Sequence, residues 1–244
     1  MAYTYTYADA WNYIAPQVRR HAEDLQAATI ANVATSEIWK RYPWKEFIVE
    51  LPTFFLTPQQ QDYGAPIVAV PADFHGLYKA YLVQLTAQPR WYPLKVLRDR
   101  ELTSPSYLPH AISYNRAKAA FRVFPRPQDG IGTCEYLIYG EYKKNPTLVT
   151  PATLQSTLLP WEDSHFQNFC TVLRWAVVAQ GSPTNGLIYE RGEYRMGGVQ
   201  AEAAAAIEQM ASDEGLLLGD SVVAPSEPLF AFDIGSNTWP LAYF

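Results

Sequence analysis

The sequence predicts an α+β fold, in which an interrupted helical bundle of one N-terminal and two C-terminal helices carries an inserted antiparallel β unit and an extended C-terminal arm. Apolar residues recur at helical spacing in the first 41 residues and again after residue 161. Between these stretches, short alternating runs separated by prolines are typical of strands. We therefore expect four parts: an N-terminal helix of the bundle (1–43), a β-rich insert (44–150), the C-terminal helices of the bundle (151–218) and a docking arm (219–244).

A long helix is predicted over residues 7–41, because a stripe of apolar and small residues falls on one of its faces. Thr6 is a favourable N-cap, and Asp9 lies where the positive end of the helix dipole favours a carboxylate. Pro16 indicates either that the helix proper begins there or that it kinks just before this residue, and Pro43 ends the element. The stripe comprises Trp11, Ile14, Ala15, Val18, Ala22, Leu25, Ala28, Thr29, Asn32, Val33 and Ser36.

The β-rich insert is predicted to consist of short strands that end at proline and turn residues. Strands are predicted at residues 45–51, 53–56, 67–70, 77–85, 111–114, 119–124 and 132–143. The fifth and sixth of these flank a turn at residues 115–118, which indicates a hairpin. The spacing of Leu94, Leu97 and Leu102 predicts one short helix over residues 95–102.

The chain returns to helix in its C-terminal third. An amphipathic helix is predicted over residues 162–180, with acidic residues at its start and Gly181-Ser-Pro183 at its end. Five residues of one face follow the spacing i, i+3, i+4, i+7 and i+11: Phe166, Phe169, Cys170, Leu173 and Val177. A second helical region is predicted over residues 187–214, where glycines weaken the first half and residues 199–210 are strong helix formers.

The charge of the chain is divided along its length. All 19 basic residues lie at or before Arg195, and the last 49 residues carry seven acidic side chains and no basic one. The same stretch ends in an aromatic segment, which is too apolar for a solvated terminus and too broken for a helix. We expect this arm to dock on a partner, although it can also fold back on its own β domain. Its expected anchors are Phe230, Phe232, Trp239, Tyr243 and Phe244.

Composition and motifs argue against several classes of function. The net charge is −5 and no basic run is present, which disfavours nucleic-acid binding through phosphate neutralisation. No dinucleotide or phosphate-binding fingerprint occurs, and no catalytic, cofactor-binding or metal-binding residue is assigned. The Asp-x-His pairs ending in His75 and His165 fit turn and helix-start residues better than metal ligands. The two cysteines, Cys134 and Cys170, fit small core residues, and neither a signal peptide nor a membrane span is expected.

Several short segments occur in an order that is characteristic of one group of virion proteins. They are Trp39-Lys-Arg-Tyr-Pro-Trp44 before a strand ending in Leu51-Pro52, Pro71-Ala-Asp-Phe74 before a long strand, Phe124-Pro-Arg-Pro127, and Tyr139-Gly-Glu-Tyr-Lys-Lys144 followed by Leu158-Leu-Pro160 and an amphipathic helix. This order resembles that of the head-to-tail adaptor proteins of short-tailed bacteriophages, over most of the chain.

The resemblance implies a structural virion protein rather than an enzyme. The family implies a ring, usually of twelve copies, at the head–tail interface, assembled from protein made in the host cytoplasm. Its partners would be the portal protein above and tail proteins below, and genomic DNA would pass through without specific binding. A C-terminal arm that reaches the portal is a theme of the family. The acidic last helix would then line the conduit through Glu202, Glu208 and Asp213, because strong phosphate contacts slow the passage of DNA.

Two other classes of function compete with the adaptor. One is a soluble enzyme whose site is dispersed over the β insert, which would require a large pocket with converging titratable groups. The other is a different tail component, such as a tube or nozzle protein. Tube subunits are usually built from sheets without a long first helix, so the opening 35 residues of helix argue against that alternative.

Overall fold

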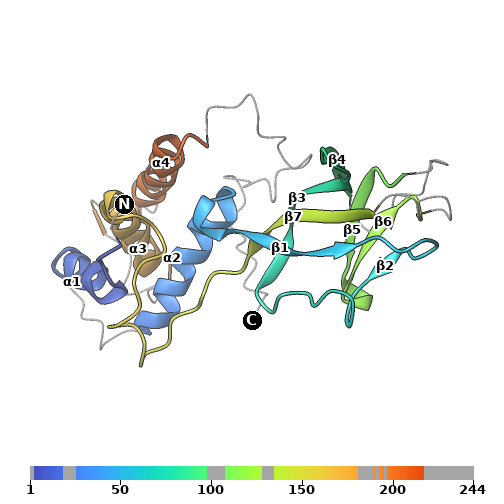
Figure 1. The fold of residues 1–244 in the computed structure, drawn as a ribbon. Helices are drawn as coiled ribbons and strands as arrows, with labels where there is room; N and C mark the ends of the chain where they lie inside the picture. Colours follow the sequence, from blue (N-terminus) through green and yellow to red (C-terminus); the bar gives the residue numbers. More distant parts are fainter. Residues whose placement is uncertain are drawn as a thin grey trace.

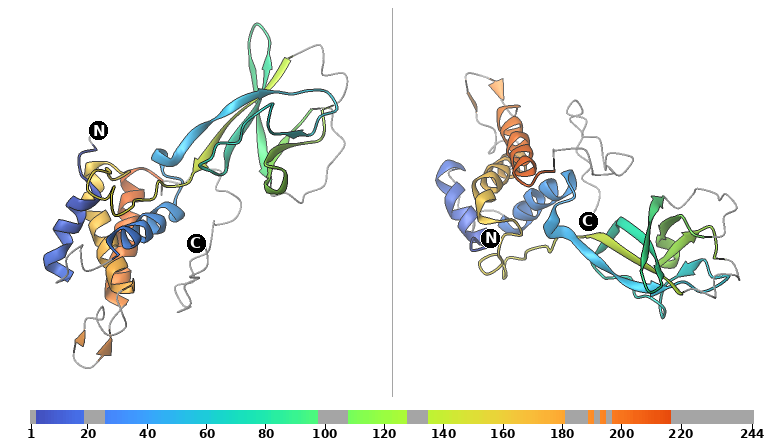
Figure 2. Two further views of the ribbon diagram at one scale, coloured as in Figure 1. Left: turned by 90° about the horizontal axis from the view of Figure 1, so that it is seen from below. Right: turned by 45° about the horizontal axis from the view of Figure 1, so that its top comes forward.

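The computed structural model describes residues 3–18, 26–97, 108–127, 135–180, 189–190, 193–194 and 197–216. Within these ranges the helices are α1 (Tyr7–Val18), α2 (Ala27–Arg41), α3 (Phe166–Gln180) and α4 (Gly197–Asp213). Short 3-10 turns are η2 (Lys45–Phe47), η3 (Arg116–Lys118) and η5 (Asp163–His165). The helices gather at one end of an elongated molecule, and the large sheet occupies the other end (Figures 1 and 2).

The start of α1 confirms the predicted cap. The Thr6 backbone N–H and its hydroxyl each donate to Asp9 Oδ2 at 2.7 Å, and the Asp9 N–H donates back to Thr6 Oγ1 at 3.2 Å. These reciprocal bonds satisfy donors that the first turn leaves without an intrahelical partner. They also lower the pKa of the Asp9 carboxyl. Pro16 lies inside α1, which continues to Val18.

Helix α3 forms the centre of the helical part, where it packs against α1, α2 and α4. Its predicted apolar face is confirmed, since Phe169, Cys170, Leu173 and Val177 are buried. Burial raises the pKa of the Cys170 thiol to about 12, as expected for an unreactive core cysteine. Tryptophans from several segments complete this core: Trp11, Trp39, Trp44, Trp161 and Trp175.

The large sheet has seven strands in the order β1-β7-β3-β4-β5-β6-β2. All neighbouring strands are antiparallel except β4 and β5, which pair in parallel through Lys95–Ala111, Val96–Ile112 and Leu97–Ser113. The bounds are β1 (Ile48–Phe55), β2 (Asp62–Tyr63), β3 (Phe74–Leu85), β4 (Arg90–Leu97), β5 (Ala111–Asn115), β6 (Ala120–Phe124) and β7 (Glu135–Lys144). Two further strands, β8 (Tyr189–Glu190) and β9 (Glu193–Tyr194), form a separate pair.

The predicted fold class is wrong. The expected α+β fold was an interrupted helical bundle with an inserted antiparallel β unit, whereas the observed α+β fold is dominated by a seven-stranded mixed sheet. The parallel β4–β5 pair makes the sheet mixed, and it joins the hairpin β5–β6 to the long strands β3 and β7 in one layer. The expected extended arm lies outside the described residues.

Several local predictions were also wrong. The single first helix is two helices, α1 and α2. Residues 95–97 belong to strand β4, because their alternation along a paired strand overrides the leucine spacing that suggested a helix. Residues 67–70 form a turn and irregular chain instead of a strand. The last helix begins only at Gly197, after the β8–β9 pair. The hairpin β5–β6 and the long strands β3 and β7 are confirmed.

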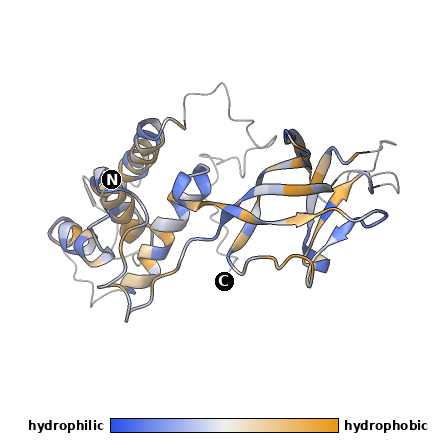
Figure 3. Cartoon of the chain, viewed as in Figure 1, coloured by the Kyte–Doolittle hydropathy of each residue, from blue (hydrophilic) through white to orange (hydrophobic). Residues whose placement is uncertain are grey.

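One face of the sheet buries its own hydrophobic core, separate from that of the helices. Leu51, Phe54, Leu82, Ile138 and Phe121 lie at its centre, and each is almost fully buried. Hydropathy colouring shows hydrophobic residues in the strands as well as in the helices (Figure 3). The sheet is therefore held together by a core that does not depend on the helices.

Lys143 joins the two parts at the end of α2. Its side chain is 6% exposed, and Nζ donates to the carbonyl oxygens of Trp39 at 2.6 Å and Tyr42 at 3.0 Å. The ammonium group thus caps carbonyls that the end of a helix leaves without partners. It also lies 4.4 Å from the centre of the Trp39 ring, while Trp39 Nε1 donates to the Lys144 carbonyl at 3.0 Å. Burial lowers the pKa of Lys143 to about 8.

Candidate functional site

Three acidic residues of α4 are predicted to line a channel. Glu202, Glu208 and Asp213 are all exposed on this helix. Glu202 forms an ion pair with Arg174 of α3, and Asp213 accepts a hydrogen bond from Gln209 at 2.7 Å. The exposed side of α4 is therefore acidic, but the charge of Glu202 is partly balanced by a neighbouring helix. The assignment of these residues to a channel stays a prediction.

A buried ionisable cluster lies at the end of α4. The side chain of Glu214 is 3% exposed, and its Oε1 lies 3.6 Å from Nε2 of His165, which is also buried. Burial and the nearby Glu46 carboxylate raise the pKa of Glu214 to about 7, and burial also raises the pKa of Glu46. Lys45 is paired with Glu162 at 2.5 Å rather than with Glu214. The end of α4 therefore holds a buried carboxyl group, Glu214, with a pKa near neutrality, and Glu46 beside it also has a raised pKa.

The two Asp-x-His sequences are engaged in structural contacts. His75 packs edge-on against Trp39, with ring centres 4.6 Å apart, and its neighbour Asp73 accepts a hydrogen bond from Tyr142. Asp163 accepts hydrogen bonds from Thr4 at 2.6 and 2.8 Å. In the part of the chain that the structure describes, no three histidine, cysteine or acidic residues are placed to share a metal ion.

A shallow hollow of about 260 Å³ lies where α2, α3 and α4 meet. Val172, Trp175, Ala203 and Ile207 line it, and Glu37 and Arg41 lie at its polar side. Much of this volume is open to solvent, and the space that a water-sized sphere can occupy is about 20 Å³, enough for roughly one water molecule. The hollow therefore offers little support for a substrate site.

The most unusual surface is the face of the sheet that points away from its core. Residues directly opposite each other on antiparallel strands project to the same side. The pairs Phe55–Leu137, Leu137–Val83 and Val83–Trp91 therefore form one row across β1, β7, β3 and β4. A second row begins with the pair Tyr139–Tyr81. We call these six residues the outer aromatic face: Phe55, Tyr81, Val83, Trp91, Leu137 and Tyr139.

The rings of the outer aromatic face are ordered against one another and remain accessible. Trp91 meets Tyr139 at 5.5 Å and Tyr81 at 6.0 Å between ring centres, both edge-on. Trp91 is nevertheless 54% exposed and Phe55 56% exposed. An antiparallel sheet with one solvated face usually places polar residues there. Between these two residues, Val83 is buried, and Tyr81, Leu137 and Tyr139 are half-buried. The exposed apolar area is therefore centred on Trp91 and Phe55, and exposed large apolar side chains that gather on one face mark interaction surfaces.

Charged residues border the outer aromatic face on one side. Glu50 and Lys79 lie opposite Glu141 across β1, β7 and β3, and the Tyr139 hydroxyl donates to Glu50 Oε1 at 2.9 Å. A polar border around an apolar centre is the usual composition of a protein–protein interface. The sequence analysis missed this face, although residues 81–83 indicate it. Tyr81 and Val83 project to one side of the strand and Leu82 to the other, and all three are apolar or aromatic.

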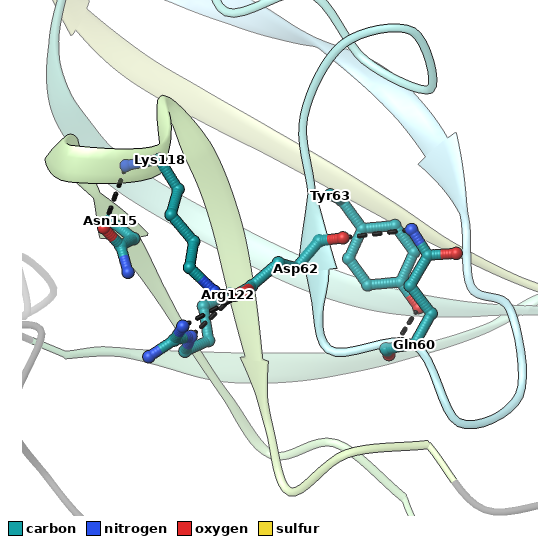
Figure 4. A network of polar contacts seen from close by, with 6 residues as sticks. All are labelled: Gln60, Asp62, Tyr63, Asn115, Lys118 and Arg122. Carbon is teal, nitrogen blue, oxygen red and sulfur yellow. Dashed lines mark hydrogen bonds and ion pairs between the residues drawn. The ribbon is translucent and has the colours of Figure 1, made fainter.

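The opposite edge of the sheet is fixed by a polar network (Figure 4). Asp62 of β2 accepts from Arg122 Nε at 2.6 Å and Nη2 at 3.0 Å, and from Lys118 Nζ at 2.6 Å. These cations, Arg122 first, lower the pKa of Asp62 to about 2. Asn115 Oδ1 accepts from the Lys118 N–H at 3.2 Å and caps η3. The network explains how a two-residue strand remains attached to the sheet.

The predicted anchors Phe230, Phe232, Trp239, Tyr243 and Phe244 lie outside the described residues, as does Cys134. The last described residues are Gly215 and Leu216, which close α4 through N–H bonds to the carbonyls of Ser212 and Ala211. None of the described helices is long and apolar enough to cross a bilayer. No protein-family model matches the chain, and a search of curated proteins finds no significant relative.

Proposed function

We propose that this chain is a structural virion protein that forms a ring adaptor between the portal and the tail of a short-tailed bacteriophage. In this role it contributes to the conduit for DNA and to the platform for tail attachment. The resemblance in the order of its sequence segments motivates the proposal. The physical support comes from the surfaces described above.

The observation that carries the proposal is the outer aromatic face. Trp91 and Phe55 are each more than half exposed, and they lie at the two ends of an apolar row across four strands in which Leu137 is half-buried and Val83 is buried. A soluble monomer rarely leaves such a surface uncovered, whereas an assembly subunit buries it against another chain. This surface favours an assembly role over the alternative of an enzyme with a dispersed site.

The charge distribution supports a conduit. The exposed residues Glu208 and Asp213 of α4 present carboxylates, and the chain from residue 196 onward contains no lysine or arginine. A wall of this kind repels phosphate and leaves DNA mobile. The salt bridge between Arg174 and Glu202 reduces the repulsion locally, so Glu208 and Asp213 carry most of this role in the proposed ring.

The proposal is tested by mixing the purified full-length chain with the portal protein of the same virus and imaging the product by electron microscopy. The expected product is a ring of this chain seated coaxially on the portal, with twelve copies as the family predicts. The proposal is refuted if the portal rings are intact but neither a ring nor a partial ring of this chain is seen on them.

A further inference from the structure

We propose that the outer aromatic face of one copy is the docking site for the C-terminal segment 229–244 of a neighbouring copy. This inference rests on the proposed ring and specifies which surface receives the arm. Four observations carry it: the exposed side chains of Trp91 and Phe55 on this face, the composition of the segment, the point where the chain leaves α4, and the charges of the two partners.

The composition of the segment fits a sheet surface. Phe230 and Phe232 are two residues apart, so both side chains project to the same side when the chain is extended. Trp239, Tyr243 and Phe244 add further aromatic side chains. Aromatic side chains bury large areas, and they pair edge-on or offset with other rings. The rings of Trp91, Tyr81 and Tyr139 already meet edge-on and leave Trp91 half exposed for such a partner.

Charge favours the same pairing. Residues 44–150, which include the sheet, hold twelve basic and nine acidic residues, a net charge of +3. Residues 217–244 hold three acidic residues and no basic one, a net charge of −3. Within the segment itself, Asp233 is the charged side chain. The border of the outer aromatic face carries both signs, with Lys79 on β3 and Lys95 on β4 exposed near the carboxylates of Glu50 and Glu141, so the complementarity lies in the net charge of the two regions. Complementary charge of this size guides the partners and opposes binding to another acidic surface.

The chain leaves the folded body at a position that allows contact with another copy. Glu214 lies beside Lys45 and Glu46, where the helices meet the start of β1, and Leu216 still packs on the helical core. The 14 residues from Leu216 to Phe230 span at most about 45 Å when extended. This distance is slightly longer than the twelve-residue strand β3, so the segment can pass from one subunit to the next.

The arrangement gives each copy one donor segment and one acceptor face. Contacts in which one surface of a subunit binds a different surface of the next are heterologous, and they close into rings when the rotation between copies permits. A chain that carries both the donor segment and the acceptor face can therefore form the closed ring that the proposed adaptor needs. The segment would also cover Trp91 and Phe55, the two side chains of the outer aromatic face that are more than half exposed.

The inference is tested by photo-crosslinking in the full-length protein. Trp239 is replaced by the photo-reactive residue benzoylphenylalanine, and this chain is mixed with an excess of unmodified ¹⁵N-labelled chain and irradiated. Crosslinks are mapped by mass spectrometry, in which the isotope identifies the chain that was hit. The matched variants are Trp91→Ser on the outer aromatic face and Tyr92→Ser, the next residue of the same strand, which points to the other side of the sheet.

We expect crosslinks from position 239 to β3, β4 or β7 of the labelled chain. Trp91→Ser in the labelled chain should reduce their yield about tenfold, as for loss of an aromatic anchor, and Tyr92→Ser should change it less than about twofold. The inference is overturned if the crosslinks are confined to the unlabelled chain, if they map to any other surface, or if none form. The ring on the portal is scored separately, so a ring that forms equally well with Trp91→Ser removes this docking site but leaves the adaptor proposal standing.

Discussion

Replacing Glu214 by glutamine changes the stability of the protein in a pH-dependent way. The folded protein holds a proton on this buried carboxyl up to about pH 7, whereas the unfolded chain releases it near the usual pKa of 4.5. Between these values the folded state binds more protons than the unfolded state. The wild-type protein therefore has the full contribution of this group below about pH 4.5 and loses it as the pH rises through 7.

The size of the effect follows from the same two values. A pKa difference between 4.5 and about 7 corresponds to roughly 3 kcal/mol at most, because one pKa unit is about 1.4 kcal/mol. Glutamine has a similar shape and no charge to lose. We therefore expect Glu214→Gln to be about 2–3 kcal/mol more stable than wild type at pH 8 and nearly equal to it at pH 4.

The assay is urea unfolding of both proteins at a series of pH values, with the difference in unfolding free energy plotted against pH. The Glu46 carboxylate contributes to the pKa shift of Glu214, so the difference reports Glu214 together with its interaction with Glu46. Glu208→Gln is the matched control, since this residue is exposed on the same helix and should change stability by less than about 0.5 kcal/mol at any pH. A Glu214→Gln variant that is equally or less stable at pH 8 refutes the reasoning.

Three further outcomes are expected. Deleting residues 229–244 should leave a cooperative melt, measured by circular dichroism, but abolish assembly with the portal; loss of the cooperative melt would place the arm in the core instead. Changing Glu202, Glu208 and Asp213 together to lysine should make assembled rings retain DNA in a filter-binding assay, and unchanged retention contradicts a channel-lining role. Asp62→Asn should lower the free energy of unfolding by about 1 kcal/mol at pH 7, a modest amount because the ion pairs of Asp62 are partly exposed, and should not change it below about pH 2. The measurement is denaturant unfolding at both pH values, and an equal loss at both would assign the effect to packing.

The local structure of this chain was predictable wherever neighbouring residues determine it. The apolar spacing of α3, the reciprocal bonds of Thr6 and Asp9, and the hairpin β5–β6 depend on residues within one or two turns of each other. Such signals survive in any tertiary context that buries the same face. They fail where two patterns compete, as in residues 95–97, whose leucine spacing suggested a helix although the chain pairs as β4.

The sheet topology and the surfaces could not be predicted in the same way, because they depend on distant partners. The parallel pairing of β4 with β5 makes the sheet mixed, and no local pattern specifies it. Nothing in the local sequence around Lys143 indicates its role, yet its ammonium group caps α2 more than 100 residues away. The outer aromatic face was missed for a similar reason, since an apolar residue on a strand does not reveal which side of the sheet is already covered.

The account depends most on the idea that the apolar surfaces of this chain are completed by other chains. The direct test is the native mass of the full-length protein, measured alone over a range of concentrations and then with the portal. We expect a product of twelve copies on the portal, and its amount should fall when Trp91 is changed to serine. A particle that stays monomeric at every concentration and ignores the portal would contradict the account.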